Sequence, residues 1–557
     1  MDRNTLLAFF LIALVLIFTP KYMEMVAPPP QGPPLPAIDN AEDTVRQVPG
    51  RSITVRDREL VASPTSAAPG ILWSGEEKII TIENELYTAA VSSNGGGSLL
   101  SFVFKDHLNK DSLGVNLING KNKENLSIRF KNLDGENINL FGPWHYVNTF
   151  SGGEIYRPQS LEFSIDVFPG KTIVKTLTFY PDSYLIDVSI NMGNVANNVF
   201  GGAYSIGWYG GLVPSEENEK DDLFYFNSFV YQGGELVDLK VKEGESETTK
   251  FNGATEWVAV RTKYFISSII PDSPGDVVSA FMGGYNDGRD IYDIALAFPA
   301  TEPTTLSLYL GPLEYDKIKS INRELERVMN FGWGFIRPIS RGVLFVLKKL
   351  HNFIPNYGYV LILFSFAVKV LVYPLTKKSY QSTAAMQQLQ PEIASLKEKH
   401  GNNPQKLNQA TMKLYKEKGV NPLGGCLPML LQMPLLFALF QVFRTTIELR
   451  AEPFVWWIKD LSAPDAVFTL PFSIPIYGSH VAVLPILMVV SMFVQQRMMS
   501  GGAAQQPQQK TMQYFMTGFF FLMFNSFPSG LNLYYTLFNV LTIAQQKLIP
   551  PAETTTV

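Results

Sequence analysis

The sequence predicts a membrane protein of mixed α and β structure, with membrane-spanning helices, a large antiparallel β-sandwich domain outside the membrane, and a cytoplasmic helical hairpin. Hydrophobic residues make up 46% of the 557-residue chain and charged residues only 17%. That balance is too apolar for a purely soluble protein and too polar for one confined to the bilayer. The middle of the chain alternates apolar and polar residues, as strands do, and long apolar runs are concentrated towards the C-terminus.

The first segment is an apolar run over residues 6–18, preceded by a short charged lead. Its length alone would also suit a signal peptide. However, the run is followed by KYME at residues 21–24 and not by a small-residue cleavage pattern. We therefore expect residues 1–26 to form a transmembrane anchor. Residues 27–70 contain nine prolines, which predicts an extended linker.

Residues 71–321 are predicted to form the antiparallel β-sandwich. In SYLIDVSINM the apolar side chains recur at every second position, at Tyr184, Ile186, Val188, Ile190 and Met192. The preceding KTIVKTLTFY reads as a second strand, joined to the first through the turn PDS. The glycine run NGGGS at residues 94–98 lacks the Gly-Lys-Ser/Thr of a phosphate loop, so a hairpin turn is favoured over a nucleotide site.

Residues 322–355 contain a linker and an amphipathic helix. One face of this helix is apolar and the other carries Arg341, Lys348 and Lys349. The apolar stripe consists of Ile339, Val343, Val346, Leu347 and Leu350. This pattern favours a helix lying in the membrane interface. An ordinary surface helix packed on the sandwich is the alternative.

Residues 356–549 are predicted to form five membrane spans, which make six with the anchor. The expected spans are 357–376, 423–443, 481–498, 512–527 and 531–549. Eight lysines and three acids lie between the first two of these five spans, so that segment is predicted to be cytoplasmic. Six spans then place both termini inside and the sandwich outside.

The cytoplasmic segment 378–422 is predicted to form two helices around the turn GNNP. An apolar seam with heptad spacing would hold them together, and it consists of Met386, Leu389, Ile393 and Leu396. Pro391 should bend the first helix. The lysine-rich outer face could contact anionic lipid headgroups or ribosomal RNA, or it could simply be solvated.

Lys369 lies inside an otherwise apolar span, where a lysine costs about 2.5 to 3.5 kcal/mol at the centre. It precedes Lys377 by eight residues, which places it about 12 Å from the cytoplasmic end of the helix. Ser365 lies one turn earlier on the same face. Together with Gln432, Asn532 and Tyr535 on other spans, it indicates a hydrated cavity between the helices. No intramembrane acid stands out as a partner, so the cation favours a functional site over a structural one.

The remaining composition excludes several classes of protein. A net charge of −4 argues against a dedicated nucleic-acid binder, and the single Cys426 excludes an intrachain disulfide. The five histidines are scattered, and no two have the spacing of a metal site. We therefore expect no metal, no cofactor, no enzymatic activity and no small-molecule substrate. A secondary transporter with an intramembrane cationic site is the main alternative, and an envelope scaffold is another.

Four stretches occur in an order that resembles the YidC/Oxa/Alb family of membrane protein insertases, in its Gram-negative form with a large periplasmic domain. They are YPLTKKSYQSTAAMQQLQPEI, VNPLGGCLPMLLQMPLLFALF, ELRAEPFVWWIKDLSAPD and FPSGLNLYYTLFNVLTIAQQ. The resemblance implies a five-helix insertase core and a chaperone-like role in protein transport. It also implies the bacterial inner membrane as location, with the β-sandwich in the periplasm.

The resemblance further implies a hydrophilic groove, open to the cytoplasm and to lipid. Lys369 occupies the position of the family's groove charge, where arginine is usual. Lysine keeps the charge but loses the planar fork that binds carboxylates in a bidentate manner. The other groove positions map onto Ser365, Tyr373, Gln432, Tyr534 and Tyr535.

The partners implied are nascent membrane proteins, Sec translocon components, membrane lipids and the ribosome. The short C-terminal tail, residues 550–557, contains no basic residue, although some relatives use a basic tail to hold ribosomes. Ribosome or lipid contact would therefore use lysines of the cytoplasmic hairpin, namely Lys377, Lys378, Lys397, Lys399, Lys413 and Lys416.

Overall fold

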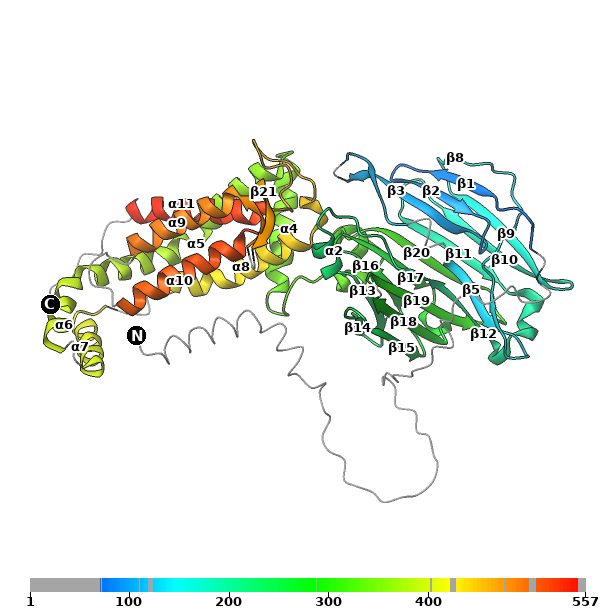
Figure 1. Ribbon diagram of the computed structural model, residues 1–557, viewed down its shortest axis with the longest axis horizontal. Helices are drawn as coiled ribbons and strands as arrows, with labels where there is room; N and C mark the ends of the chain where they lie inside the picture. Colours follow the sequence, from blue (N-terminus) through cyan, green and yellow to red (C-terminus); the bar gives the residue numbers. More distant parts are fainter. Residues whose placement is uncertain are drawn as a thin grey trace, which may run out of the picture.

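The computed structural model describes residues 71–548, apart from 72, 110, 119–123, 287, 401–402, 421–426, 475–476 and 500–506. The predicted anchor, linker and C-terminal tail lie outside the described residues. Two parts lie next to each other along the longest axis, one rich in strands and the other made mostly of helices (Figure 1).

The β-rich part contains three sheets. The largest has the order β14(Glu235–Leu239)-β13(Asn227–Gln232)-β16(Trp257–Arg261)-β17(Phe265–Pro271)-β20(Thr304–Pro312)-β11(Leu185–Asn191)-β10(Lys171–Phe179)-β9(Gln159–Phe168)-β7(His145–Tyr146). The second has the order β15(Ser246–Asn252)-β18(Ser279–Asn286)-β19(Asp290–Pro299)-β12(Ala203–Trp208)-β5(Asn125–Lys131)-β6(Asn137–Asn139). The third has the order β4(Gly114–Asn116)-β3(Ser98–Leu108)-β2(Tyr87–Ser92)-β1(Ile79–Glu83)-β8(Gly153–Glu154).

Short helical segments connect these strands and lead into the second part. They are η2(Gly193–Asn198), η3(Phe200–Gly202), α2(Glu219–Phe224), η4(Pro274–Asp276), α3(Tyr315–Ser320) and η5(Leu325–Val328). Among them α2 lies at the end of the β-rich part that faces the helices (Figure 1).

Strand β11 shows why the alternating pattern predicted the sheets correctly. Ile186, Val188 and Ile190 are buried on one face, whereas Ser189 and Asn191 on the other face are exposed. Its antiparallel partner β10 precedes it through the predicted PDS turn. Pairing is antiparallel throughout the named strands except for a two-residue parallel ladder between β1 and β8, which the sequence pattern did not predict.

The NGGGS turn joins β2 to β3, so the hairpin prediction is confirmed. Gly95, Gly96 and Gly97 all have positive φ angles, which a residue with a side chain rarely adopts. Beneath this turn the fully buried Lys175 donates hydrogen bonds from Nζ to the Gly95 carbonyl at 3.0 Å and the Leu126 carbonyl at 2.6 Å. Burial lowers the pKa of Lys175 to about 7. Lys175 thus ties the turn to strand β5.

The helical part consists of long helices and one small sheet. The helices are α4(Arg337–His351), α5(Tyr357–Gln388), α6(Gln390–His400), α7(Pro404–Glu417), α8(Leu427–Thr445), α9(Val483–Met499), α10(Pro507–Phe524) and α11(Ser529–Leu548). A short turn, η7(Ile447–Leu449), follows α8, and the sheet pairs β21(Ala466–Ile474) with β22(Gly478–Ala482). Helix α11 packs against both α5 and α9, and α4 packs against α8 and α5.

Helix α5 continues without a break from the predicted second span into the predicted hairpin. The expected boundary near residue 378 is therefore not a helix end. The chain bends instead at Leu389, just before Pro391, as the proline predicted. Helices α6 and α7 contact each other at the end of the molecule opposite the β-rich part (Figure 1).

The amphipathic helix α4 differs from its predicted stripe by one position. Val343, Leu344 and Leu347 are buried, whereas Val346 is 38% exposed. Because α4 packs on two helices at once, its buried face is wider than a single stripe and shifts towards Leu344.

Within the described residues, the stretch Tyr357–Pro374 of α5 is long and apolar enough to cross a membrane, with a mean hydropathy of 1.6. Val483–Met498 and Tyr514–Phe524 are apolar but shorter. The count of six spans therefore stays a prediction.

Candidate functional site

Lys369 of α5 is buried between helices, with 6% of its surface exposed. Its Nζ donates a hydrogen bond to Oγ1 of Thr542 on α11 at 2.6 Å. The same nitrogen lies 4.1 Å from the ring centroid of Phe538, one turn earlier on α11, where the ring face attracts a cation. Among the described residues, no Asp or Glu forms an ion pair with Lys369. The neighbours of the Lys369 ammonium are thus the neutral hydroxyl of Thr542 and the aromatic ring face of Phe538.

A second polar contact between the same two helices lies further along α5. Gln545 of α11 donates from Nε2 to Oγ1 of Thr376 at 3.0 Å. Thr376 and Thr542 are both buried. Lys369 and Thr376 are seven residues apart, and Thr542 and Gln545 are three apart, so each pair lies on one face of its helix. The α5–α11 contact therefore includes two polar pairs between helices that are otherwise mostly apolar.

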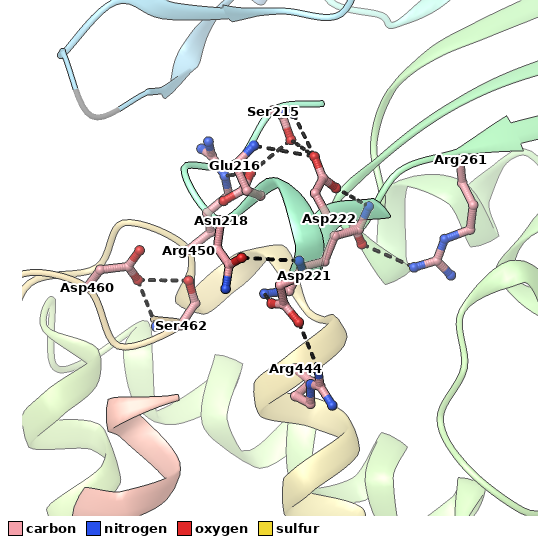
Figure 2. A network of polar contacts seen from close by, with 11 residues as sticks. Ser215, Glu216, Asn218, Asp221, Asp222, Arg261, Arg444, Arg450, Asp460 and Ser462 are labelled. Atoms are coloured by element: carbon pink, nitrogen blue, oxygen red, sulfur yellow. Dashed lines mark hydrogen bonds and ion pairs between the residues drawn. The ribbon is translucent and has the colours of Figure 1, made fainter. Parts of the chain in front are cut away.

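The β-rich part and the helical part are joined by ion pairs (Figure 2). Asp221 of α2 lies between Lys263 and Arg444, with 2.7 Å from Oδ2 to Lys263 Nζ and 2.7 Å from Oδ1 to Arg444 Nη2. Arg450 reaches Glu216 at 2.8 Å. Burial opposes ionisation of Asp221, but Lys263 and Arg444 outweigh it, so its pKa lies below the ordinary value. We call these five residues the α2 junction.

A separate cluster joins the two parts through α4. Lys348 Nζ lies 2.5 Å from Asp316 of α3, 3.4 Å from Glu448 of η7 and 3.6 Å from Glu314. One lysine of the helical part is therefore shared between the end of the β-rich part and the turn that follows α8. With the α2 junction, this cluster fixes the β-rich part against α8 and α4 at two points.

Two family models match the chain, and together they span most of it. One is described as the 60Kd inner membrane protein and matches residues 349–554, and the other as the YidC periplasmic domain and matches residues 79–341. A curated protein named membrane protein insertase YidC, from Pelodictyon phaeoclathratiforme, is 37% identical over 100% of this chain and 95% of its own length. The chain belongs to the YidC family of membrane protein insertases.

Other relatives carry the same name. The membrane protein insertase YidC of Chlorobaculum tepidum is 35% identical over 98% of this chain and 94% of its own. A solved structure of an active YidC insertase, with its first transmembrane domain resolved, covers 85% of this chain and 93% of its own at 18% identity and a TM-score of 0.36.

Membership of this family indicates the activity and the cellular location of the chain. It is a membrane protein insertase, an inner-membrane protein with a periplasmic domain, and its clients are membrane proteins. Membership favours this function over the secondary transporter.

The other predicted groove residues of this YidC family member lie on α5, α8 and α11. The buried Ser365 donates to the Leu361 carbonyl of its own helix at 2.7 Å, so its hydroxyl is already satisfied. Tyr534 and Tyr535 are buried on α11, and neither hydroxyl has a hydrogen-bond partner among the described residues. Tyr373 is 43% exposed and Gln432 is half-buried.

Lys369 was predicted to have no fixed acidic partner and to be available to clients, and that availability stays a prediction. Thr542 and Phe538 contact the amine, and no acid of the described part of the chain forms an ion pair with it. Sequence reasoning missed both residues, and it also missed Thr376 and Gln545. The one available signal was a recurrence of polar residues on the final span, at Thr542 and Gln545, inside TLFNVLTIAQQ.

The predicted cytoplasmic lysines lie on α5, α6 and α7. Those with exposed side chains are Lys377, Lys397, Lys399, Lys413 and Lys416. The side chain of Lys378 lies outside the described residues. In the seam between α6 and α7, Leu389 and Leu407 are buried, and Lys418 pairs with Glu392 at 3.1 Å. Most of the hairpin's positive charge thus faces outward.

Proposed function

We propose that Lys369 supplies the charge that attracts acidic segments of client proteins during insertion. The supporting observation is a buried ammonium whose neighbours within the described chain are a hydroxyl and an aromatic ring. A buried charge without a counter-ion is costly. A carboxylate that approaches Lys369 would lower that cost, and Lys369 would lower the cost of desolvating the carboxylate.

The proposed cycle begins when a polar tail or short loop of a client enters from the cytoplasm towards Lys369. The apolar segment of the client then moves into lipid alongside α8 and α10. Each Leu-like residue of that segment gains about 0.3 to 0.6 kcal/mol on the insertion scale, so transfer to lipid supplies the drive. Ser365, Tyr373, Gln432, Tyr534 and Tyr535 are the proposed lining of this route.

Insertion of a short client with an acidic tail tests the role of Lys369. Cells depleted of the native protein would be rescued with Lys369→Glu, Lys369→Gln or the unaltered chain. We expect the strongest loss with Glu, because it repels the tail, and a smaller loss with Gln. Lys547→Glu, an exposed lysine on α11, is the matched control for charge reversal. Normal insertion with Lys369→Glu would contradict the proposal.

The proposed topology has six spans, with both termini cytoplasmic and residues 71–321 in the periplasm. Lysine bias and the positions of the apolar runs support it. Single cysteines placed at Lys399 and at Glu302, in a chain whose Cys426 is replaced by serine, would test it. A membrane-impermeant maleimide should label residue 302 in cells with a permeable outer membrane, and residue 399 only after lysis.

We further propose that the lysines of the cytoplasmic hairpin contact ribosomes or lipid headgroups, and that the protein also works beside the Sec translocon. The outward-facing charge of Lys397, Lys399, Lys413 and Lys416 supports the first part. Co-sedimentation with ribosomes should fall in a variant with these four lysines changed to Gln. Equal co-sedimentation would contradict the proposed contact with ribosomes.

A further inference from the structure

The hydroxyl proton of Thr542 is already used in a hydrogen bond to its own helix. A threonine hydroxyl carries one proton and two acceptor lone pairs. Its proton goes to the Phe538 carbonyl, because Oγ1 lies 2.6 Å from that oxygen. The two lone pairs are left for donors, and the Lys369 ammonium occupies one of them at 2.6 Å.

This arrangement makes Thr542 an acceptor towards Lys369 with no proton left to give. The hydroxyl cannot rotate to present a hydrogen to the ammonium without losing its bond to the backbone. Phe538 adds a second attraction from the same helix, since its ring face lies 4.1 Å from Nζ. Both contacts hold the ammonium against α11.

The ammonium still has donors to spare. A lysine carries three N–H groups, and the bond to Thr542 is the one hydrogen bond that the described part of the chain gives to Lys369. The remaining N–H groups are available to an incoming acceptor. A carboxylate offers two acceptor oxygens and full negative charge, so it gains more from this site than an amide does.

We propose that Thr542 is a positioning residue that fixes the Lys369 ammonium within the membrane and so sets the preference for clients with acidic tails. This inference rests on the proposed role of Lys369. Without the acceptor, the flexible lysine chain leaves its position over Phe538 and the charge moves towards the cytoplasmic surface. Insertion of clients that do not depend on the charge is then unaffected.

The test compares two clients that differ only in the tail, one with Asp and Glu and the other with Asn and Gln at the same positions. Insertion of both is measured in cells that contain the full-length chain with Thr542→Val or Thr542→Ser. Valine has nearly the shape of threonine but no hydrogen-bond acceptor, whereas serine retains the acceptor hydroxyl. Thr536→Val is the control, because Thr536 lies on the same helix and only donates to the Asn532 carbonyl of its own backbone at 2.8 Å.

We expect Thr542→Val to lower the ratio of acidic-tail to neutral-tail insertion about tenfold or more, as the loss of a hydrogen bond to a charged group implies. Thr542→Ser and Thr536→Val should keep the ratio of the unaltered chain. If Thr542→Val lowers both clients equally, or if Ser fails to restore the ratio, Thr542 is merely structural and the inference is wrong.

Lys369→Gln separates this inference from the proposed function. If Lys369→Gln lowers the ratio and Thr542→Val does not, Lys369 attracts clients without help from Thr542, and only the inference fails. If Lys369→Gln leaves the ratio unchanged, the proposed role of Lys369 fails, and the inference fails with it.

Discussion

Asp221 should matter more to the stability of this protein than its partner Arg444 does. At the α2 junction Asp221 neutralises two cations, Lys263 with 5% of its side chain exposed and Arg444 with 25%. Asp221→Asn leaves both cations without a counter-charge. Arg444→Gln leaves Asp221 still paired with Lys263.

The expected magnitudes follow from burial. Breaking a buried pair by removing one partner costs about 3 to 5 kcal/mol, and Lys263 is buried enough to approach that range, so we expect about 3 kcal/mol for Asp221→Asn. Loss of the hydrogen bond to Arg444, whose side chain is 25% exposed, should cost about 1 to 2 kcal/mol. In the double variant the two losses overlap, and the coupling energy should be about 1 kcal/mol.

Thermal unfolding of the full-length chain in detergent measures these effects. At roughly 2 to 4 °C per kcal/mol, Asp221→Asn should lower Tm by about 6 to 12 °C and Arg444→Gln by about one third to two thirds as much. Lys220→Gln, an exposed neighbour on α2, is the control and should leave Tm unchanged. Equal losses for both variants, or fully additive losses in the double variant, would refute the reasoning.

Acidification should remove the difference between Asp221→Asn and the unaltered chain. The pKa of Asp221 in the folded protein lies below its ordinary value, because the two cations outweigh burial. Its stabilising contribution is therefore fully present above the ordinary pKa of about 4 and is lost as the pH falls through the folded value. The two Tm curves should converge below about pH 4, and a constant gap would contradict this.

Three further outcomes are expected. Burial lowers the pKa of Lys175 to about 7 in the folded protein, so between pH 7 and 10 the unfolded chain binds more protons than the folded chain does. The stability of the folded protein should therefore rise with pH in this range. Lys175→Met should flatten the corresponding rise in Tm. Gly358→Ala should lower Tm, because its Cβ would lie 1.9 Å from the Phe454 ring and such overpacking costs about 1 to 3 kcal/mol. Lys418→Ala should change stability by less than about 1 kcal/mol, because its pair with Glu392 is about half exposed; a larger change in urea unfolding would contradict this.

Local patterns in the sequence predicted the local structure well. The alternation in β11 predicted a strand with one buried face, and the glycine run at residues 94–98 predicted a hairpin turn. These features depend on a few consecutive residues, so the sequence contains the whole signal. The predicted buried face of α4 was less accurate. Packing against α5 and α8 buries Leu344 in place of Val346, and the sequence of α4 alone does not show where these two helices lie.

Contacts between distant segments could not be predicted. Hydropathy predicts an intramembrane position for Lys369, but its partner Thr542 lies 173 residues further along the chain. Asp221 and Arg444 are separated by 223 residues. Any of the chain's acids could have paired with Arg444 as far as composition shows, and the fold alone selects one of them.

Helix α5 is one long helix that connects the buried Lys369 with the hairpin. Its 32 residues extend about 48 Å as one rod, from its start beside Phe454 to the base of the hairpin. Pro374 removes one backbone hydrogen bond within this helix, so α5 bends more easily there than elsewhere. Pro374 lies only five residues beyond Lys369. A change of bend at Pro374 would therefore move the C-terminal part of α5, which leads into the hairpin, relative to the part that contains the buried Lys369.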